Sequence, residues 1–332
     1  MRFLGKKLLF YAVALLAALS LNFLIPRLAP GNPVDAVLAR QSSMAPVSPE
    51  ARHSLELLLG VGDRPMWQQY FSYLGQLVTG DLGRSVTFFP APVGDIIGQA
   101  LPWTLGLVGV ATVVSFTLGI SLGALAGWFR RGFVDSLVAG STMLAAVPYF
   151  WLALAAVFFL AAGLGWFPLG LGYDVEVEPG WSGEFVGDVV YHALLPALTI
   201  VVSSLAGWLL GMRNMMVSTL SEDYVVTAQA KGLSLRRVMV TYAARNAVLP
   251  SVSGVAVSLG FVVGGAIVTE AVFSYPGIGF TLLQAVRNSD YPLMQGIFLV
   301  ITLAVLGANL LVDLLYAVID PRVRTTAKAG AR

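Results

Sequence analysis

The stretch from Thr104 to Gly127 reads TLGLVGVATVVSFTLGISLGALAG and contains no charged side chain. A bilayer has a hydrocarbon core about 30 Å thick, which an α-helix crosses with roughly 20 apolar residues. The stretch is therefore long enough to cross a membrane as one helix. It predicts a membrane protein.

The composition of the whole chain supports this interpretation. Of its 332 residues, 57% are hydrophobic and 11% are charged, whereas soluble domains average roughly 45–50% apolar and about 25% charged residues. The net charge of +2 is too small to indicate a nucleic-acid partner, and the basic residues form no patch interleaved with aromatics. The absence of cysteine excludes disulfides, thiol catalysis and thiolate metal sites.

Six apolar stretches are long enough to span a bilayer, so we predict an all-α polytopic membrane protein with six transmembrane helices. The third span contains Pro148, where we expect a kink or break because proline lacks the backbone N–H of a helix interior. The expected spans cover residues 8–25, 104–127, 136–164, 193–210, 252–268 and 297–318.

The basic residues indicate the orientation of these spans. With the N-terminus inside, 14 of the 20 Lys and Arg residues fall on the inner side and 6 on the outer side. Because cytoplasmic loops carry the excess of positive charge, we expect a plasma (inner) membrane protein with both termini in the cytoplasm. Arg2, Lys6 and Lys7 before the first span also allow a signal peptide, although its apolar run exceeds the typical 7–15 residues.

The chain divides into four expected regions. Residues 1–26 form the first transmembrane helix, 27–98 an extracytoplasmic segment, 99–318 the main transmembrane domain, and 319–332 a cytoplasmic tail. Within the extracytoplasmic segment, clusters of Pro, Gly and polar residues separate two short helical patterns. These patterns cover residues 49–59 and 67–78.

Residues 219–250 form the longest charged, helix-patterned stretch, which includes SEDYVVTAQAKGLSLRRVMVTYAARNAVLP from Ser221 to Pro250. Thr219 and Glu222 have the spacing of a capping box, and Ser221 is an equally good N-cap. Acidic residues at the start of a helix and a basic residue in its last turn suit the helix dipole. The sequence therefore predicts a helix that begins near Glu222 and ends near Lys231.

Gly232 follows this helix, where a left-handed residue commonly closes it. Ser234 can cap a second helix, which we expect to run from Leu235 towards Val248. Pro250 would mark its junction with the fifth span. We expect a hairpin whose second, basic helix points back to the membrane, with its positive charges at Arg236, Arg237 and Arg245.

The first helix of this hairpin is poor in charge at its centre, where a solvated helix usually carries more. Such a helix suits a groove of another protein. The alternative is a solvated loop whose arginines contact lipid head groups. The uncharged residues are Val225, Val226, Ala228, Gln229 and Ala230.

The stretch DYVVTAQAKGLS, residues 223–234, resembles the EAA-type coupling motif of ATP-binding-cassette (ABC) importer permeases, in the dipeptide, oligopeptide and nickel branch. Ala228 and Gly232 match the motif. Val226 stands where the general motif has Glu, and Thr227 occupies the second position. Leu249-Pro250 lies five residues further from the glycine than in the general form, a spacing typical of the peptide branch.

Other stretches resemble the same family, so the resemblance covers nearly the whole chain. They include the start of the transmembrane domain, the connection between spans five and six, the last helix and the end of the first span. These stretches are TGDLGRS (79–85), PV (92–93), PWTL (102–105), EAVFSYPGIG (270–279), SDYPLMQG (289–296), NLLVDLLYAVIDPRVR (309–324), NF (22–23) and PGNP (30–33).

The resemblance implies the fold of a type I ABC importer transmembrane domain and a set of partners. These are a homologous second permease, two ATPase subunits that carry ATP and Mg²⁺, an extracytoplasmic solute-binding protein, and membrane lipid. It also implies peptide cargo, while relatives with similar motifs import nickel, glutathione or sugars. The implied ATPase-coupling residues are Glu222, Asp223, Tyr224, Thr227, Ala228, Ala230, Lys231, Gly232, Arg236 and Arg237.

Nothing in the sequence indicates an enzyme or a bound cofactor. His53 and His192, the only histidines, lie far apart, and we interpret both as ordinary surface or interfacial residues. The chain lacks the H-E-x-x-H, G-x-S-x-G and phosphate-loop patterns. Two further classes stay open: a self-sufficient channel or secondary transporter, although such proteins usually carry ionisable groups at midplane, and a membrane scaffold.

Two acidic residues lie within or beside the spans. Asp313 shares a helix face with Asn309 and Tyr316, and we expect a hydrogen-bonded clasp between helices in preference to a cargo or ion site. Glu270, at the outer end of the fifth span, either meets cargo or caps the connection beside Tyr275.

Overall fold

The computed structural model describes most of the chain. Four of the described helices are long and apolar enough to cross a membrane. The described residues are 2–28, 65–129, 138, 140–144, 146–252, 254, 258 and 267–319. The apolar spans are Lys7–Ile25 in α1 (Arg2–Leu28), Val93–Trp128 (α5), Gly183–Thr219 (α8) and Tyr291–Leu311 in α15 (Tyr291–Ile319).

These helices confirm the first, second, fourth and sixth expected spans. The α5 and α8 helices contain 36 and 37 residues and extend well beyond the apolar stretches that predicted them. At 1.5 Å per residue each is roughly 54 Å long, more than the hydrocarbon core requires. Most of the fifth span (252–268), the helical pattern at 49–59 and nearly all of the tail (319–332) lie outside the described residues.

The third span is interrupted at the predicted proline. Residues 140–144 are helical, residues 146 and 147 form a turn and a bend, and Pro148 stands at the N-cap of α7 (Tyr149–Ala156). The helix then continues as the π-helical segment η1 (Val157–Gly163). The break at Pro148 is therefore confirmed, whereas the π-helical end was not expected.

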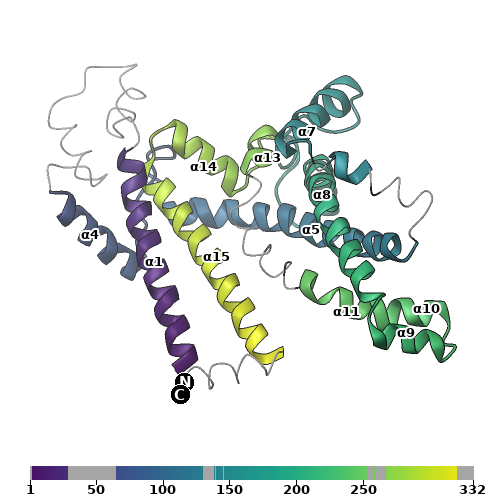
Figure 1. Cartoon of the computed structure of the whole chain (residues 1–332). Helices are drawn as coiled ribbons and strands as arrows, with labels where there is room; N and C mark the ends of the chain where they lie inside the picture. Colours follow the sequence, from purple (N-terminus) through teal and green to yellow (C-terminus); the bar gives the residue numbers. More distant parts are fainter. Residues whose placement is uncertain are drawn as a thin grey trace, which may run out of the picture. The chain divides into compact units, whose positions relative to one another are not determined.

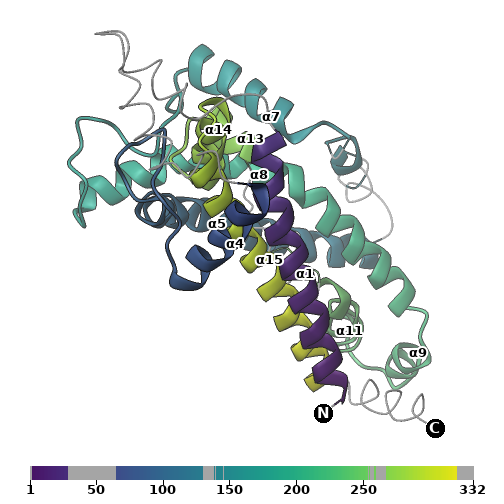
Figure 2. The same ribbon diagram turned by 90° about the vertical axis from the view of Figure 1, so that its left-hand side faces the viewer.

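The chain folds as two units that divide α5 between Thr104 and Leu105. The first unit contains α1, α4 (Met66–Thr79), the start of α5, α14 (Ile278–Arg287) and α15. Both views show α1 and α15 side by side (Figures 1 and 2). The helix pattern predicted at 67–78 is confirmed by α4.

The core of the first unit joins the start of α5 to α14 and α15. Val93, Ile97, Ile278, Leu293 and Ile297 are almost completely buried in it. A Cβ atom at Gly296 would lie 2.5 Å from a methyl group of Val93, so α15 and α5 meet closely here.

The second unit contains the rest of α5, α7, η1, α8, the hairpin that follows α8, and most of α13 (Ile267–Val272). Its long helices, α5 and α8, meet along three glycines spaced one turn apart: Gly119, Gly123 and Gly127. A Cβ atom at Gly123 would lie 2.5 Å from the Leu209 carbonyl oxygen. Small residues at such spacing allow helix backbones to approach closely.

Candidate functional site

The predicted hairpin begins where α8 ends, at Thr219. The next helix, α9 (Asp223–Ala230), has Glu222 at its N-cap, and no side chain caps it. The predicted capping box and the alternative cap at Ser221 are therefore wrong. The reason is that α8 continues through Thr219, whose carbonyl accepts the Glu222 N–H at 3.1 Å, while the Ser221 hydroxyl donates back to Ser218 at 2.7 Å.

The turn after α9 has the predicted backbone geometry. Gly232 adopts φ +74°, and its N–H donates to the Gln229 carbonyl at 2.9 Å. Lys231 occupies the C-cap position instead of the last helical turn. A Cβ atom at Gly232 would meet nothing within 4 Å, so only the left-handed backbone requires glycine there.

The second arm is helical but not uniformly α-helical. It runs through α10 (Leu235–Arg237), the π-helical segment η2 (Val238–Ala244) and α11 (Arg245–Ala247). Ser234 stands at its N-cap as expected, without a capping hydrogen bond from its side chain. After a turn at Val248 the helix resumes, and Pro250 lies in its first turn, where a missing N–H does no harm.

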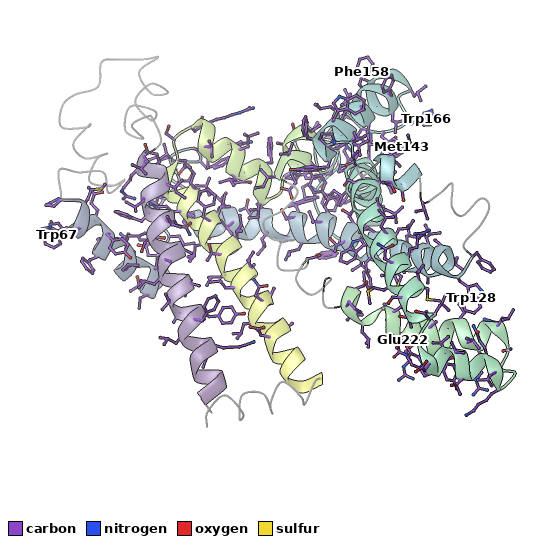
Figure 3. The ribbon with its side chains drawn as sticks, in the orientation of Figure 1. Trp67, Trp128, Met143, Phe158, Trp166 and Glu222 are labelled. Atoms are coloured by element: carbon purple, nitrogen blue, oxygen red, sulfur yellow. The ribbon has the colours of Figure 1, made fainter. Side chains whose placement is uncertain are left out.

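An internal core fixes the hairpin to the long helices. Val225 and Ala228 from α9 and Val238 from η2 are buried together, packed against Trp128 of α5 and Leu220 after α8. Figure 3 labels Trp128 beside this part of the chain. A second cluster continues the contact along α8 and consists of Met212, Met216, Ala243 and Ala247.

This packing changes the interpretation of the uncharged residues in α9. Val225 is 0% and Ala228 is 3% exposed. Both side chains face the protein's own core, so they are not free to enter a groove of a partner. The interpretation that the uncharged residues suit a groove of a partner does not apply to these two, because η2 folds back over them.

The rest of the hairpin presents apolar and charged groups to solvent together. Tyr224, Val226 and Leu235 are 41%, 50% and 68% exposed. No ion pair involves the charged hairpin side chains among the described residues. Patches that combine exposed apolar groups with charges are typical of protein interaction sites. The other exposed predicted residues are Glu222, Asp223, Thr227, Ala230, Lys231, Gly232, Arg236 and Arg237.

Residues 119–325, which contain the hairpin, α8 and α15, match the family described as "binding-protein-dependent transport system inner membrane component". The chain belongs to this family. It is a permease subunit of an ABC importer and has the family's type I transmembrane domain.

Several curated permeases are similar along nearly their whole length. The di/tripeptide transport system permease protein DppB of Pseudomonas aeruginosa is 36% identical, with 92% of this chain and 93% of that protein covered. The oligopeptide transport system permease protein AppB of Bacillus subtilis is 32% identical, with 93% and 95% covered. The dipeptide transport system permease protein DppB of Escherichia coli is 33% identical, with 92% and 93% covered.

In the first unit of this permease, the structure brings together motifs that lie far apart in the sequence. The carboxylate of Asp290, which is 0% exposed, accepts hydrogen bonds from the Ser85 hydroxyl, the Thr87 N–H and the Leu293 N–H. It therefore ties the TGDLGRS stretch to the start of α15. Both motifs are recognisable in the sequence, but their contact was not predicted.

A second contact links the PWTL and PGIG motifs. The Thr104 hydroxyl, which is fully buried, accepts the Ile278 N–H at 2.8 Å. Ile278 is the first residue of α14, so Thr104 satisfies one of the free N–H groups at the start of that helix. This contact was also not predicted.

Asp313 joins two helices of the permease, as predicted. One carboxylate oxygen lies 2.7 Å from the Lys7 ammonium nitrogen, and the other accepts a hydrogen bond from the Tyr11 hydroxyl at 2.9 Å. Both partners are on α1 and were not predicted. Asn309 forms no hydrogen bond within the described part of the chain, and the side chain of Tyr316 lies outside it.

Glu270, the predicted cargo candidate, is 0% exposed in α13. Its backbone carbonyl accepts the Tyr275 N–H at 2.8 Å. Burial and, to a smaller extent, the nearby Glu270 charge together raise the pKa of Tyr275 to about 12. These contacts favour the alternative interpretation, in which Glu270 stabilises the connection beside Tyr275.

His192 is not a surface residue, as it is only 9% exposed. Its Nδ1 lies 3.0 Å from the carbonyl oxygen and 3.3 Å from a carboxylate oxygen of Asp188, one turn earlier in α8. His53 lies outside the described residues. Among the residues that the structure describes, no group of three or more His, Asp or Glu side chains could hold a metal ion.

Proposed function

We propose that this permease subunit imports small peptides and that its hairpin couples ATPase closure to rearrangement of the spans. The proposal of coupling rests on one observation: the hairpin has both a buried cluster and an exposed outer face. The buried cluster packs on the ends of α5 and α8 and consists of Val225, Ala228 and Val238. The face, which includes Tyr224 and Val226, is open to a partner.

The mechanism follows from this arrangement. ATP binding closes two partner ATPase subunits, and α9 sits in a groove on one of them. Movement of α9 displaces the ends of α5 and α8, because the hairpin core packs directly on them. Arg236 and Arg237, which are exposed and without ion pairs among the described residues, would contact acidic groups at the groove edge.

Peptide cargo is supported by the names of the relatives, which are transport permeases for dipeptides, di/tripeptides and oligopeptides. The other proposed partners are a homologous second permease, which completes the pathway, and a solute-binding protein outside. ATP and Mg²⁺ bind to the ATPase subunits, and the assembled complex hydrolyses ATP. The permease itself has no enzymatic role in this proposal.

The proposed topology places both termini and the hairpin in the cytoplasm and keeps the regions expected from the sequence. These are the first helix (1–26), an extracytoplasmic segment (27–98), the transmembrane domain (99–318) and a tail (319–332). The uneven distribution of Lys and Arg supports this orientation. It also places the hairpin on the side where the ATPases bind ATP.

The experiment is ATP-driven uptake of a labelled dipeptide by the complete importer in proteoliposomes, with Gly232→Val in the permease. A β-branched residue at φ +74° strains the turn by about 1–2 kcal/mol, which tilts α9 without removing a contact. Uptake should fall about fivefold or more while membrane insertion is unchanged. The matched control is Gly232→Asn, because Asn tolerates the left-handed region and should retain uptake.

Two results would contradict the proposal. Undiminished uptake in Gly232→Val would remove the hairpin from the mechanism. Uptake by the permease alone, without ATPase subunits or ATP, would favour the channel or secondary-transporter class.

A further inference from the structure

The α4 helix (Met66–Thr79) carries no charged residue in its sequence MWQQYFSYLGQLVT. It lies outside the apolar spans, in the segment that the sequence assigns to the extracytoplasmic side. A short helix surrounded by water usually carries charge on its solvated face. Exposure to water alone therefore does not explain why α4 has no charged residue.

One side of α4 packs on the end of the first span. The Phe23 ring lies 5.3 Å from the Tyr70 ring and 5.7 Å from the Tyr73 ring, centroid to centroid. The Tyr70 and Ser20 hydroxyls share a hydrogen bond of 2.7 Å. Both Ser20 and Phe23 belong to the apolar span Lys7–Ile25. The middle of α4 is thus at the depth of the last turns of a membrane-spanning helix.

A second apolar stripe of α4 is uncovered. Trp67, Phe71 and Val78 are 62%, 64% and 89% exposed. At 3.6 residues per turn their side chains fall within an arc of about 40°. Figure 3 shows Trp67 projecting from α4 on the side away from α1. The exposed stripe is therefore distinct from the side that packs on Phe23.

The polar residues of α4 lie on a separate face, about a third of a turn around the helix from this stripe. Gln68, Ser72, Gln76 and Thr79 are all exposed, and helical geometry places them together on one face. The helix is thus amphipathic without being charged. The same end of α1 also exposes apolar side chains, with Leu21 and Ile25 at 56% and 49%.

We propose that α4 lies partly in the bilayer, at the leaflet nearest Leu28, with Trp67, Phe71 and Val78 in contact with lipid acyl chains. Three observations favour lipid over a protein partner. The helix packs on the last turns of an apolar span, it has no charge to steer a partner, and the exposed Trp67 lies near its N-terminal end. The inference holds whatever cargo the importer carries.

The absence of natural cysteine makes a direct test available. Single cysteines at Phe71 and Val78 are labelled with the environment-sensitive fluorophore NBD in the complete importer, in nanodiscs of phosphatidylcholine. Ser72→Cys, next to Phe71 but on the polar face, is the matched control. The quencher is phosphatidylcholine with a doxyl group high on one acyl chain, where an interfacial helix sits.

The expected result is a blue-shifted emission at positions 71 and 78 and quenching by the doxyl lipid of about twofold or more. The probe at position 72 should show neither. Val78→Cys replaces an 89% exposed side chain, so it tests the inference even if Phe71→Cys disturbs folding.

Other occupants of the stripe give different results, each of which overturns the inference. If another subunit or residues 29–64 of this chain cover it, the probe emission is blue-shifted but the doxyl lipid does not quench it. If the stripe faces water, the emission is unshifted and all three positions react equally with a membrane-impermeant maleimide.

Discussion

The α1 and α15 helices lie side by side and are joined by charged and polar side chains, with Lys7 and Tyr11 binding the Asp313 carboxylate at 2.7 and 2.9 Å. Between α5 and α8 the backbones themselves approach, and Gly119, Gly123 and Gly127 leave no room for a Cβ atom. One pair should be sensitive to charge and the other to volume.

The two helix pairs also support different parts of the molecule. The α5–α8 contact leads directly into the hairpin core, where Met212 and Met216 pack on Ala243 and Ala247. A close backbone contact leaves little freedom for one helix to slide on the other. We infer that α5 and α8 move together when the hairpin is displaced. The contacts of Asp313 with Lys7 and Tyr11, by contrast, only hold α15 against α1.

The largest effect is expected from Gly123→Leu. The new side chain would begin 2.5 Å from the Leu209 carbonyl oxygen and 2.8 Å from the Met212 Cβ. Since backbone atoms cannot move aside as a flexible side chain does, α5 and α8 must separate. Folded protein, measured by size-exclusion chromatography in detergent, should be nearly lost.

The matched control lies on the same helix. A Cβ atom at Gly109 would meet nothing within 4 Å, so Gly109→Leu should be recovered at the level of the unmodified chain. If both variants behave alike, close packing of α8 does not explain the requirement for glycine.

A smaller effect is expected from Asp290→Ala, which tests the other end of α15. The change leaves the buried Ser85 hydroxyl and the Leu293 N–H without their acceptor, and unsatisfied buried groups cost about 1–3 kcal/mol each. The unfolding temperature in detergent should fall clearly. Ser85→Ala removes one donor to Asp290 and the acceptor of the Phe88 N–H, but the Thr87 and Leu293 N–H groups keep their acceptor. It should therefore lower the unfolding temperature less than Asp290→Ala does, and an equal fall would contradict this explanation.

The smallest effect is expected from Asp313→Asn. The change keeps an acceptor for the Tyr11 hydroxyl but leaves Lys7 without its charge partner. The side chains of Lys7 and Asp313 are 26% and 34% exposed. The expected loss is about 1 kcal/mol. A double-mutant cycle with Lys7→Met, followed by thermal unfolding, should show that the second change costs less once the first is made. Strict additivity would show that the pair contributes nothing.

Apolar length and charge predicted much of the fold. Four expected spans, the break at Pro148, the helix at 67–78 and the left-handed Gly232 are confirmed. Each depends on a local property of the chain, such as hydrophobic length, a missing N–H or a turn residue. Such properties can be recognised without knowing which segments meet.

Contacts between distant segments were predicted less well. Asp313 was recognisable as a charge in an apolar helix, but its partners Lys7 and Tyr11 depend on how α1 packs. Likewise, nothing in α9 distinguishes the buried Ala228 from the exposed Val226, since η2 decides which is covered. Of the 35 glycines, only packing identifies the three at the α5–α8 contact.

The central claim, that the exposed face of α9 contacts an ATPase, is tested most directly by cross-linking neighbouring positions. Single cysteines replace Val226, which is 50% exposed, and Val225, which is 0% exposed. The complete importer is treated with a short thiol-to-amine cross-linker. The account predicts a permease–ATPase product from position 226 and almost none from position 225. Absence of the product at 226, in a complex that still imports dipeptide, would contradict it.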